Sequence, residues 1–393
     1  MKIMQLAWPV ALALLPLGQA LARDPVTVTV EVPGESGTRS LRSVDALLNA
    51  LTNNALRGVA PSYTSNTAAL ARIDVRGVPA LASFAANSPA MRVQIPTTGL
   101  DRTFNGATRD DSTRLFRSFI LGGEGSAARN DLLRAAVRSS PIDPIAGGPN
   151  SALTQLAVAD FGRALQGEFG MRTGYGIGLG VGSFSAGGYN SFSMTIPLDA
   201  TWRVGDRATF SVDAPVTYTS TAGATSYSGN IGGQYRHQVL DNWQVQISGR
   251  LGAAGSAALG GGSGIYGMGG ISTLRVPLGE GWRLTLINAL NYVSTFRSAV
   301  GGPTIDYNVA NTIFRNGVIL ARDLPFEVMG QPLSASAYAV DTRFAGSPVF
   351  VRHFQEFGVF VSPGQDSRFG AGFQIMTGDR GLFGFTFSSG VRF

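Results

Sequence analysis

The sequence predicts an all-β transmembrane barrel of about 12 antiparallel strands, preceded by a mainly α-helical N-terminal domain. Three observations predict this fold. Apolar residues alternate with polar ones from about residue 170 to residue 393, they recur at helical spacing from residue 23 to about residue 166, and a short apolar leader precedes both regions. Long strands with one apolar face match a bilayer that is crossed at a tilt. The chain therefore divides into a helical half and a membrane half.

Residues 1–22 have the features of a secretory signal peptide. Lys2 supplies a positive charge, residues 6–17 are mostly apolar, and small residues precede Arg23. We expect export through the Sec machinery and a mature chain that begins near Arg23. The sequence contains no later run of 18 apolar residues, so it predicts no transmembrane helix.

Residues 23–150 form the predicted helical domain, whose role as a leader, plug or passenger stays open. Helical spacing and capping residues predict helices over 43–58, 110–122 and 126–137. Short strand-like segments lie at Val26–Val32 and Met91–Ile95.

Residues 151–169 are expected to form a linker helix between this domain and the barrel. In the first predicted strand, every second residue is a glycine that faces the lumen: Gly174, Gly176, Gly178, Gly180 and Gly182. Two interpretations stay open. The linker helix enters the lumen and packs along these glycines, or the glycines relieve crowding in a narrow barrel.

The barrel itself is expected to span residues 170–393. An even number of strands places both chain ends on one side, and closure leaves no unpaired backbone edge in lipid. We count 12 strands, with 10 or 14 also open, at 171–184, 190–204, 207–219, 224–238, 242–254, 262–276, 281–295, 307–321, 331–343, 348–361, 367–377 and 381–393.

The connections predict an orientation. Tight junctions at 204–206, 240–242 and 278–281 are expected in the periplasm, and the longer glycine-rich links 255–262 and 296–306 are expected outside. An indole ring favours a membrane interface because it has an apolar body and a polar N–H. Three tryptophans beside the tight junctions are therefore expected to form an interfacial girdle: Trp202, Trp243 and Trp282.

Charged residues on the predicted inner face are candidates to line the lumen. They are biased towards arginine: Asp199, Arg203, Arg207, Asp213, Arg250, Arg283 and Arg392. We expect them to pair with one another or to hold the N-terminal segment. Selection of anions in a pore is the other interpretation.

Composition and charge exclude several classes of function. The formal net charge is +6, but the basic residues are not clustered, which argues against a nucleic-acid partner. The chain has no cysteine and only two histidines. His237 lies beside a predicted periplasmic turn, on the wrong rim for a barrel phospholipase, and His353 has no serine two residues away, as such an enzyme would have. The sequence therefore predicts no enzyme, no metal site and no cofactor.

The last strand resembles the signal by which Gram-negative outer-membrane barrels are recognised by their assembly machinery. The matching residues are Phe383, Phe385, Phe387, Val391 and the terminal Phe393. This resemblance implies the Gram-negative outer membrane as location, with the lipid bilayer and the barrel assembly machinery as partners.

The order of leader, N-terminal domain, helix and about 12 strands also resembles the translocation unit of autotransporters. It implies passage across the outer membrane, as autotransporter-like export or as gated transport, with the N-terminal domain as passenger or plug. A structural or adhesin-like surface protein anchored by the barrel and a small passive porin are the alternatives. The sequence names neither a solute nor a passenger partner.

Overall fold

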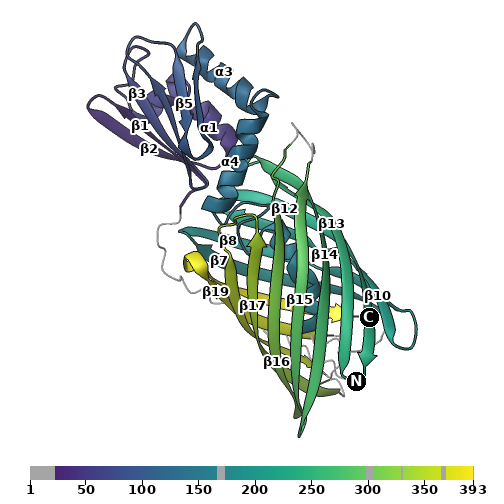
Figure 1. Cartoon of the computed structure of the whole chain (residues 1–393). Coiled ribbons are helices and arrows are strands. Elements are labelled where there is room, and N and C mark those ends of the chain that lie inside the picture. Colours follow the sequence, from purple (N-terminus) through teal and green to yellow (C-terminus); the bar gives the residue numbers. More distant parts are fainter. Residues whose placement is uncertain (1–22, 166–172, 298–304, 329–330, 364–368, 393) are drawn as a thin grey trace, which may run out of the picture.

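The protein consists of a β-barrel, a smaller domain at one end of the barrel, and a helix that connects them (Figure 1). The structure is a computed structural model that describes residues 23–165, 173–297, 305–328, 331–363 and 369–392. We call residues 23–139 the cap and residues 140–151 the junction segment. The signal peptide prediction and Phe393 lie outside the described residues.

The barrel is closed, because its last strand pairs with its first along ten residues. Two of the strands are each interrupted once, at Pro197 and at Pro215, where a proline without an N–H breaks the ladder. The barrel therefore has twelve strand positions built from fourteen segments, which confirms the predicted number. The segments are β7 (Gly174–Ala186), β8 (Tyr189–Ile196), β9 (Leu198–Arg203), β10 (Ala208–Asp213), β11 (Val216–Thr221), β12 (Ala224–Leu240), β13 (Trp243–Ser256), β14 (Gly261–Gly279), β15 (Trp282–Phe296), β16 (Ala310–Val328), β17 (Gln331–Gly346), β18 (His353–Pro363), β19 (Phe369–Gly378) and β20 (Phe383–Arg392).

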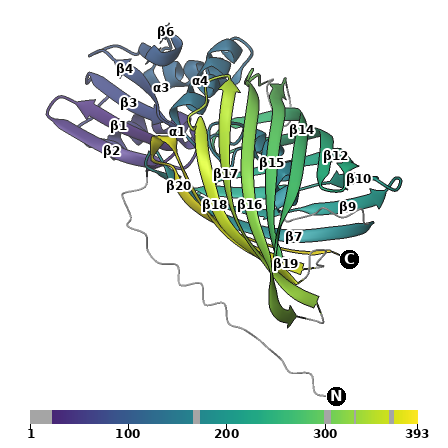
Figure 2. The same ribbon diagram turned by 60° about the horizontal axis from the view of Figure 1, so that its bottom comes forward.

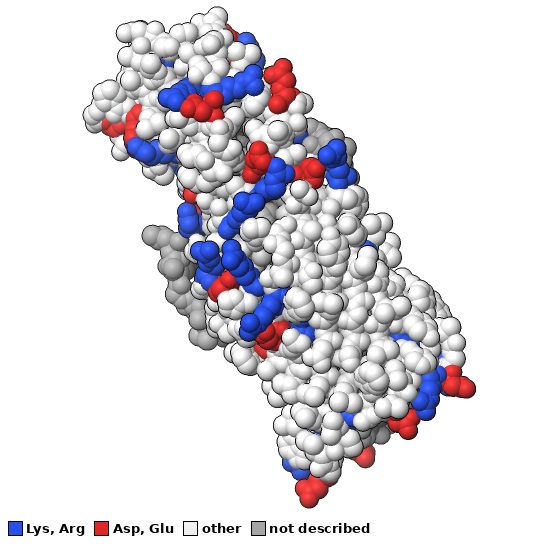
Figure 3. All heavy atoms as spheres, in the orientation of Figure 1, with Lys and Arg blue, Asp and Glu red and all other residues white. Residues whose placement is uncertain are grey.

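The outer wall of the barrel is apolar. Strand residues alternate between an exposed outer face and a buried inner face, as in β15, where Leu286 and Leu290 are exposed and Ile287 and Asn291 are buried. In the view of Figure 3, much of the wall carries no charged side chain, whereas charges gather on the cap, around its junction with the barrel and at the opposite end. Such a wall matches the hydrocarbon core of a bilayer.

The two rims of the barrel differ in their connections. Short turns join β9 to β10, β12 to β13 and β14 to β15 at the rim where β7 begins and β20 ends, which we call the short-turn rim. The longer connections 257–260, 297–309 and 347–352 lie at the other rim, which we call the cap-side rim, as do the two-residue turns 187–188 and 222–223. The three predicted tight junctions and the two predicted longer links lie at opposite rims, as expected from the sequence.

The cap is built from a sheet and helices in comparable amounts. Its sheet is antiparallel and six-stranded, in the order β2-β1-β3-β4-β5-β6. The elements are β1 (Val26–Val32), β2 (Glu35–Leu41), α1 (Val44–Ala50), α2 (Asn53–Val59), β3 (Ala69–Val75), β4 (Val78–Phe84), β5 (Met91–Ile95), β6 (Leu100–Phe104), α3 (Arg109–Leu121) and α4 (Ser126–Ser139), with a short 3₁₀ turn at Pro96–Thr98.

The expectation of a mainly helical N-terminal domain was therefore wrong. Strands β1 and β5 match the predicted segments, but β2, β3, β4 and β6 were missed. The reason is visible in β3, where buried Ala69 and Ala71 alternate with intermediate or exposed residues. Alanine is the strongest helix former, so its alternation does not read as a strand.

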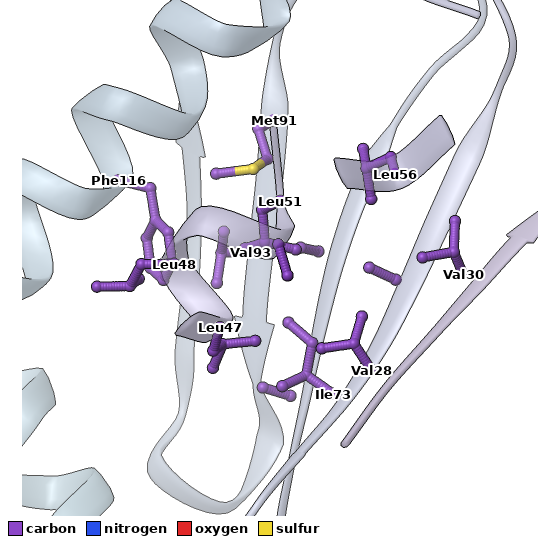
Figure 4. Packing of buried hydrophobic residues seen from close by; sticks show 14 of the residues in the cluster. Val28, Val30, Leu47, Leu48, Leu51, Leu56, Ile73, Met91, Val93 and Phe116 are labelled. Atoms are coloured by element: carbon purple, nitrogen blue, oxygen red, sulfur yellow. The ribbon is translucent and has the colours of Figure 1, made fainter. Parts of the chain in front are cut away.

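The cap has its own apolar core between one face of the sheet and the helices. Val28 and Val30 of β1 and Ile73 of β3 point towards α1 and α2, and Phe116 of α3 completes the packing (Figure 4). The helix predicted over 43–58 is in fact two, because the chain turns between Ala50 and Asn53. The cap is thus a two-layer α/β domain.

The cap lies on the cap-side rim, at the end of the barrel opposite to the C-terminal end of β20 (Figures 1 and 2). Three backbone hydrogen bonds join the cap to the barrel, Arg23 N to Gly188 O, Val44 N to Ala258 O and Phe350 N to Val137 O, and a fourth, Val351 N to Gly147 O, joins the junction segment to the barrel. The first uses the β7–β8 hairpin, whose two glycines both have positive φ, as a type I′ turn requires.

Candidate functional site: the occupied lumen

The connecting helix α5 (Ala152–Leu165) lies against the inner wall of the barrel. It packs on strands β12 to β16, most extensively on β14 and β15. Leu153, Leu156 and Ala157 are buried together with Ile265 of β14 and Val293 of β15. Because these strand residues face inward, the helix lies inside the lumen.

Two glycines of the wall make room for the helix. A Cβ atom at Gly267 of β14 would lie 3.3 Å from Leu156 Cδ2, and one at Gly317 of β16 would lie 2.9 Å from Phe161 Cζ. Phe161 is buried among Ile271, Ile287 and other apolar residues of the inner wall. These glycines, and not those of β7, allow the close approach of α5.

An ion-pair cluster inside the barrel holds the middle of α5. Arg250 of β13 donates from Nε to Asp160 of α5 (3.0 Å) and from a terminal nitrogen to Asp213 of β10 (2.6 Å). Its second terminal nitrogen also contacts both carboxylates, and Asn230 accepts a further hydrogen bond at 2.9 Å. All three ionic side chains are almost fully buried. We call Asp160, Asp213 and Arg250 the Arg250 cluster.

A second buried pair lies beside the end of the helix. Arg315 of β16 donates to Glu356 of β18 at 2.6 Å, and its guanidinium carbon lies 4.7 Å from the centre of the Phe161 ring. Glu356 also accepts from Gln374, which accepts from Tyr338. This network joins four strands through the lumen and places a cation on the aromatic ring of α5.

The junction segment is buried between the cap and the barrel. Asp143 accepts from Arg76 of the cap at 2.6 Å and from the hydroxyl of Tyr307, in a cap-side connection, at 3.3 Å. It also accepts from the backbone of Ile145 and Ala146. Burial raises the pKa of Asp143 and that of Tyr307. One carboxyl group therefore links three parts of the chain.

The predicted lumen glycines face inward, and Tyr175, Ile177 and Leu179 between them are exposed on the outer wall. The main contacts of α5 are with β12 to β16 and not with β7, which argues against the first of the two interpretations, packing of the helix along these glycines. The space beside Gly176 is filled by the Asp199 carboxylate, and only Thr195 approaches a Cβ position at Gly180. The alternative, that these glycines relieve crowding between neighbouring strands, fits the contacts better.

The predicted lumenal charges separate into two groups. Asp213 and Arg250 meet in the Arg250 cluster, and Arg283 pairs with Asp323 at 2.6 Å. In contrast, Arg203 and Arg207 lie exposed at the short-turn rim, where they pair with Asp206 and Asp241 of the turns. The Arg392 side chain lies outside the described residues.

The predicted interfacial tryptophans all lie next to the short turns. Trp202 is exposed and stacks on Phe210, Trp243 donates to Ser272 at 3.0 Å, and the Trp282 ring lies under the Arg322 guanidinium. Phe383, Phe387 and Val391 of β20 are exposed on the outer wall, as a lipid-facing strand requires, and Phe385 stacks on Phe373. Whether these residues act as girdle and assembly signal stays a prediction.

Sequence reasoning missed several charged residues of the interior. It selected neither Asp160, Arg315 and Glu356 in the lumen nor Asp143 in the junction segment. A signal existed for Asp160, because it shares one helix face with Leu153, Leu156 and Ala157, where a carboxylate needs a buried partner. The pairing of Arg315 with Glu356 depends on register across β16, β17 and β18, which the sequence does not specify.

The two histidines are far apart in the barrel. His237 stacks on Tyr235 on β12, and His353 lies 3.8 Å from Asp379 near the start of β18. Within the described ranges, no group of three His, Asp or Glu side chains could hold a metal ion. The helices of the described chain are also too short or too polar to cross a membrane.

Comparisons with known proteins give similarities at the level of the barrel. No protein-family model matches the chain, and no curated protein matches it. The β-domain of the Bordetella autotransporter BrkA is 16% identical, with a TM-score of 0.44 over 56% of this chain and 98% of that chain. The translocator domain of autotransporter NalP from Neisseria meningitidis is 14% identical, with a TM-score of 0.43 over 61% of this chain and 98% of that chain. An outer-membrane channel from Pseudomonas putida F1 is 12% identical, with a TM-score of 0.41 over 57% and 97%.

The closed barrel and its apolar outer wall define the class of the protein. A sheet without edges and with lipid-compatible outward side chains is the form in which β-structure crosses a bilayer. The protein is a closed twelve-stranded β-barrel of the outer-membrane type, and its similarity to the solved structures above is one of barrel fold.

Proposed function

We propose that the protein is an autotransporter-like exporter of its own N-terminal domain, which it then retains at the cell surface as a cap. The path of the chain through the barrel is the main support for this proposal. The chain leaves the cap at the cap-side rim, passes down the lumen as α5, and begins β7 at the short-turn rim. The cap and the first strand thus lie at opposite ends of a lumen that the polypeptide itself occupies.

The sidedness of barrels supports an external cap. Barrels of this kind insert with their short turns in the periplasm and their longer loops outside. The short-turn rim carries the start of β7 and the end of β20, and the cap lies at the other rim. A cap outside the cell must have crossed the membrane, and the lumen is the route that its connecting helix still follows.

The dimensions of the barrel indicate the state in which the cap crosses. Barrels of 8 strands are filled by their own side chains, and open aqueous channels appear at 16 to 18 strands. A twelve-stranded lumen admits an extended chain or a helix but not a folded six-stranded sheet with four helices. The chain has no cysteine, so no disulfide would oppose unfolding before passage.

The buried contacts at the junction favour retention of the cap over release. Residues 140–149 are buried throughout, and Asp143 is bonded to both the cap and the barrel. A protease would reach this segment only after the junction opens. We infer a surface domain that stays attached.

A single-cysteine labelling experiment tests this function. Gly123 in the cap and Gly205 in a short turn are both exposed glycines with open space at the Cβ position. We expect a membrane-impermeant maleimide to label Gly123→Cys in intact cells and to label Gly205→Cys only after permeabilisation. Labelling of Gly205→Cys alone in intact cells would reject the proposed orientation and make the cap periplasmic, and protection of both would contradict an exposed cap at the rim opposite to the short turns.

A gated channel is the second candidate. Gly176, Gly178 and Gly180 on the inner wall of β7 retain partial exposure, and at Gly180 only Thr195, among the described residues, lies within 4 Å of a Cβ position. Space on this side of the helix would suit a small solute. Conductance measurements in planar bilayers separate the two candidates. A gated channel should show openings in the full-length protein, whereas an exporter whose lumen is closed at rest should conduct weakly.

A further inference from the structure

The lipid-facing wall of the barrel contains one polar site at mid-height. On β15 and β16 the exposed outer side chains are mostly large and apolar: Leu286, Leu290, Phe314, Val318 and Leu320. Between them lie two exposed carboxamides, Asn288 and Asn316. They are direct cross-strand neighbours in the register of β15 and β16.

The position of this pair along the strands places it inside the apolar belt. Asn288 lies six residues from Trp282 and eight from Phe296, which are the two ends of β15. A strand residue rises by about 3.3 Å, so Asn288 is roughly 20 Å along the strand from the tryptophan, well beyond the interfacial zone. Neither carboxamide has a recorded hydrogen bond to the part of the chain that the structure describes.

The polar site continues on the same face towards the cap-side rim. Asn316 is registered with Asp341 of β17, which is registered with Gln355 of β18. Asp341 accepts from Gln355 at 2.8 Å and from Arg343 at 2.7 Å, so these groups satisfy one another. Gln355 lies two residues from the start of β18 and thus near the polar rim. Among the described residues of the barrel, the two asparagines are the members of this row without a hydrogen-bond partner.

An unpaired amide in hydrocarbon is strongly unfavourable, because lipid chains offer it no hydrogen bond. A carboxamide is both a donor and an acceptor, so it is complementary to another carboxamide. A second copy of the chain brings such groups to the same depth, because all copies insert in one direction. A two-fold axis along the membrane normal then places the same patch opposite itself.

The residues around Asn288 and Asn316 are small enough for the outer wall of a second barrel to approach closely. The outer face of the adjacent β17 carries Ala335, Ala337 and Ala339, and Gly270 of β14 lies on the other side, registered with Leu290. Small residues leave the backbone accessible, as they do where membrane segments pack closely. These small residues would let a second barrel approach closely enough for the asparagines of the two copies to form hydrogen bonds.

We propose that the outer wall of β15 to β17 is a homodimer interface in the membrane, in which Asn288 and Asn316 of one copy hydrogen-bond to the same residues of a second copy. The interface is independent of the position of the cap and of the exporter function.

Disulfide crosslinking in isolated outer membranes tests the interface, because the chain has no cysteine of its own. Val318→Cys lies two residues from Asn316 on the same face and leaves both amides in place. Leu179→Cys on β7 is the matched control, since Leu179 is 39% exposed, Val318 is 40% exposed, and β7 lies across the barrel. We expect oxidation to give a dimer of twice the chain mass with Val318→Cys and little with Leu179→Cys.

A second pair of substitutions separates specific contact from random collision. Asn288→Leu with Asn316→Leu is compatible with lipid, so the barrel should fold, which a shift in gel migration on boiling verifies. In the Val318→Cys background these changes should lower the crosslinking yield severalfold. Equal yields at the two cysteine positions, an unchanged yield in the leucine variant, or a crosslinked product that contains a different protein would overturn the proposal.

Discussion

Arg250 is the residue whose charge holds α5 in the lumen. It compensates two buried carboxylates, Asp160 on the helix and Asp213 on the wall. A buried charge that loses its partner is strongly destabilising, whereas an exposed ion pair contributes little. The same residue type should therefore have very different effects at Arg250 and at the exposed Arg203.

We expect Arg250→Met to lower the free energy of unfolding of the detergent-solubilised protein by about 3 to 5 kcal/mol. Arg203→Met should lower it by less than about 1 kcal/mol, because the Arg203–Asp206 pair lies in solvent. Tryptophan fluorescence during denaturant unfolding measures the difference, since Trp202, Trp243 and Trp282 are in the barrel and residues 23–165 contain no tryptophan. Equal effects of the two substitutions would show that the Arg250 cluster is not intact.

The stability of the junction segment should depend on pH through Asp143. Burial raises its pKa above the ordinary value of 3.8, so the folded junction binds this proton more tightly than the unfolded chain does. The contribution of Asp143 to stability is then greatest below about pH 3.8 and declines as the pH rises through the raised value.

Asp143→Asn should remove this dependence, because the amide does not ionise. We would compare the rate of proteolysis within residues 140–150 for the two proteins between pH 3 and pH 8. The ratio of the original rate to the variant rate should rise with pH. A ratio that falls with pH would mean that pairing with Arg76 outweighs burial and lowers the pKa.

At the scale of elements, α5 depends on glycines of the wall it touches. A methyl group at Gly317 would meet the Phe161 ring at 2.9 Å, whereas at Gly180 it would meet only Thr195, at 3.8 Å or more. We expect Gly317→Ala to be destabilising by about 1 to 3 kcal/mol and Gly180→Ala to be close to neutral. The fluorescence assay above measures both, and a larger loss at Gly180 would indicate that the helix packs on β7.

The elements that the sequence predicted well are those in which one face meets lipid. All twelve strand positions were found, because a lipid-facing residue must be apolar and the alternation is therefore strong, as in Phe383, Phe385 and Phe387. The cap strands are different. In β4 the inward residues include Ala80 and Ala82, whose small side chains fit under the helices but carry no strand signal.

The lumenal site was predictable only where a charged residue stands out from a local sequence pattern. Inward charges such as Asp213 and Arg250 stood out against the alternating pattern. Their partners did not, because the contacts of Asp160 and Glu356 arise from helix placement and strand register. Those are properties of the assembled barrel rather than of any local segment.

At the scale of the whole molecule, we expect the barrel to be closed as a channel. Because α5 fills one side of the lumen and the junction segment covers the cap-side rim, the full-length protein should conduct weakly in planar bilayers. A variant without residues 23–165 should conduct more strongly. Equal conductance of the two forms would mean that α5 leaves the lumen in the membrane.

The presence of α5 inside the barrel is the central claim, and crosslinking in native membranes tests it most directly. Leu156→Cys and Gly267→Cys join a helix residue to the wall residue it touches, and Leu156→Cys with Gly178→Cys is the control pair. A short bis-maleimide should link the first pair in assembled protein and leave the control pair unlinked. Linkage of the control pair alone, or of neither pair in correctly folded barrels, would contradict the account.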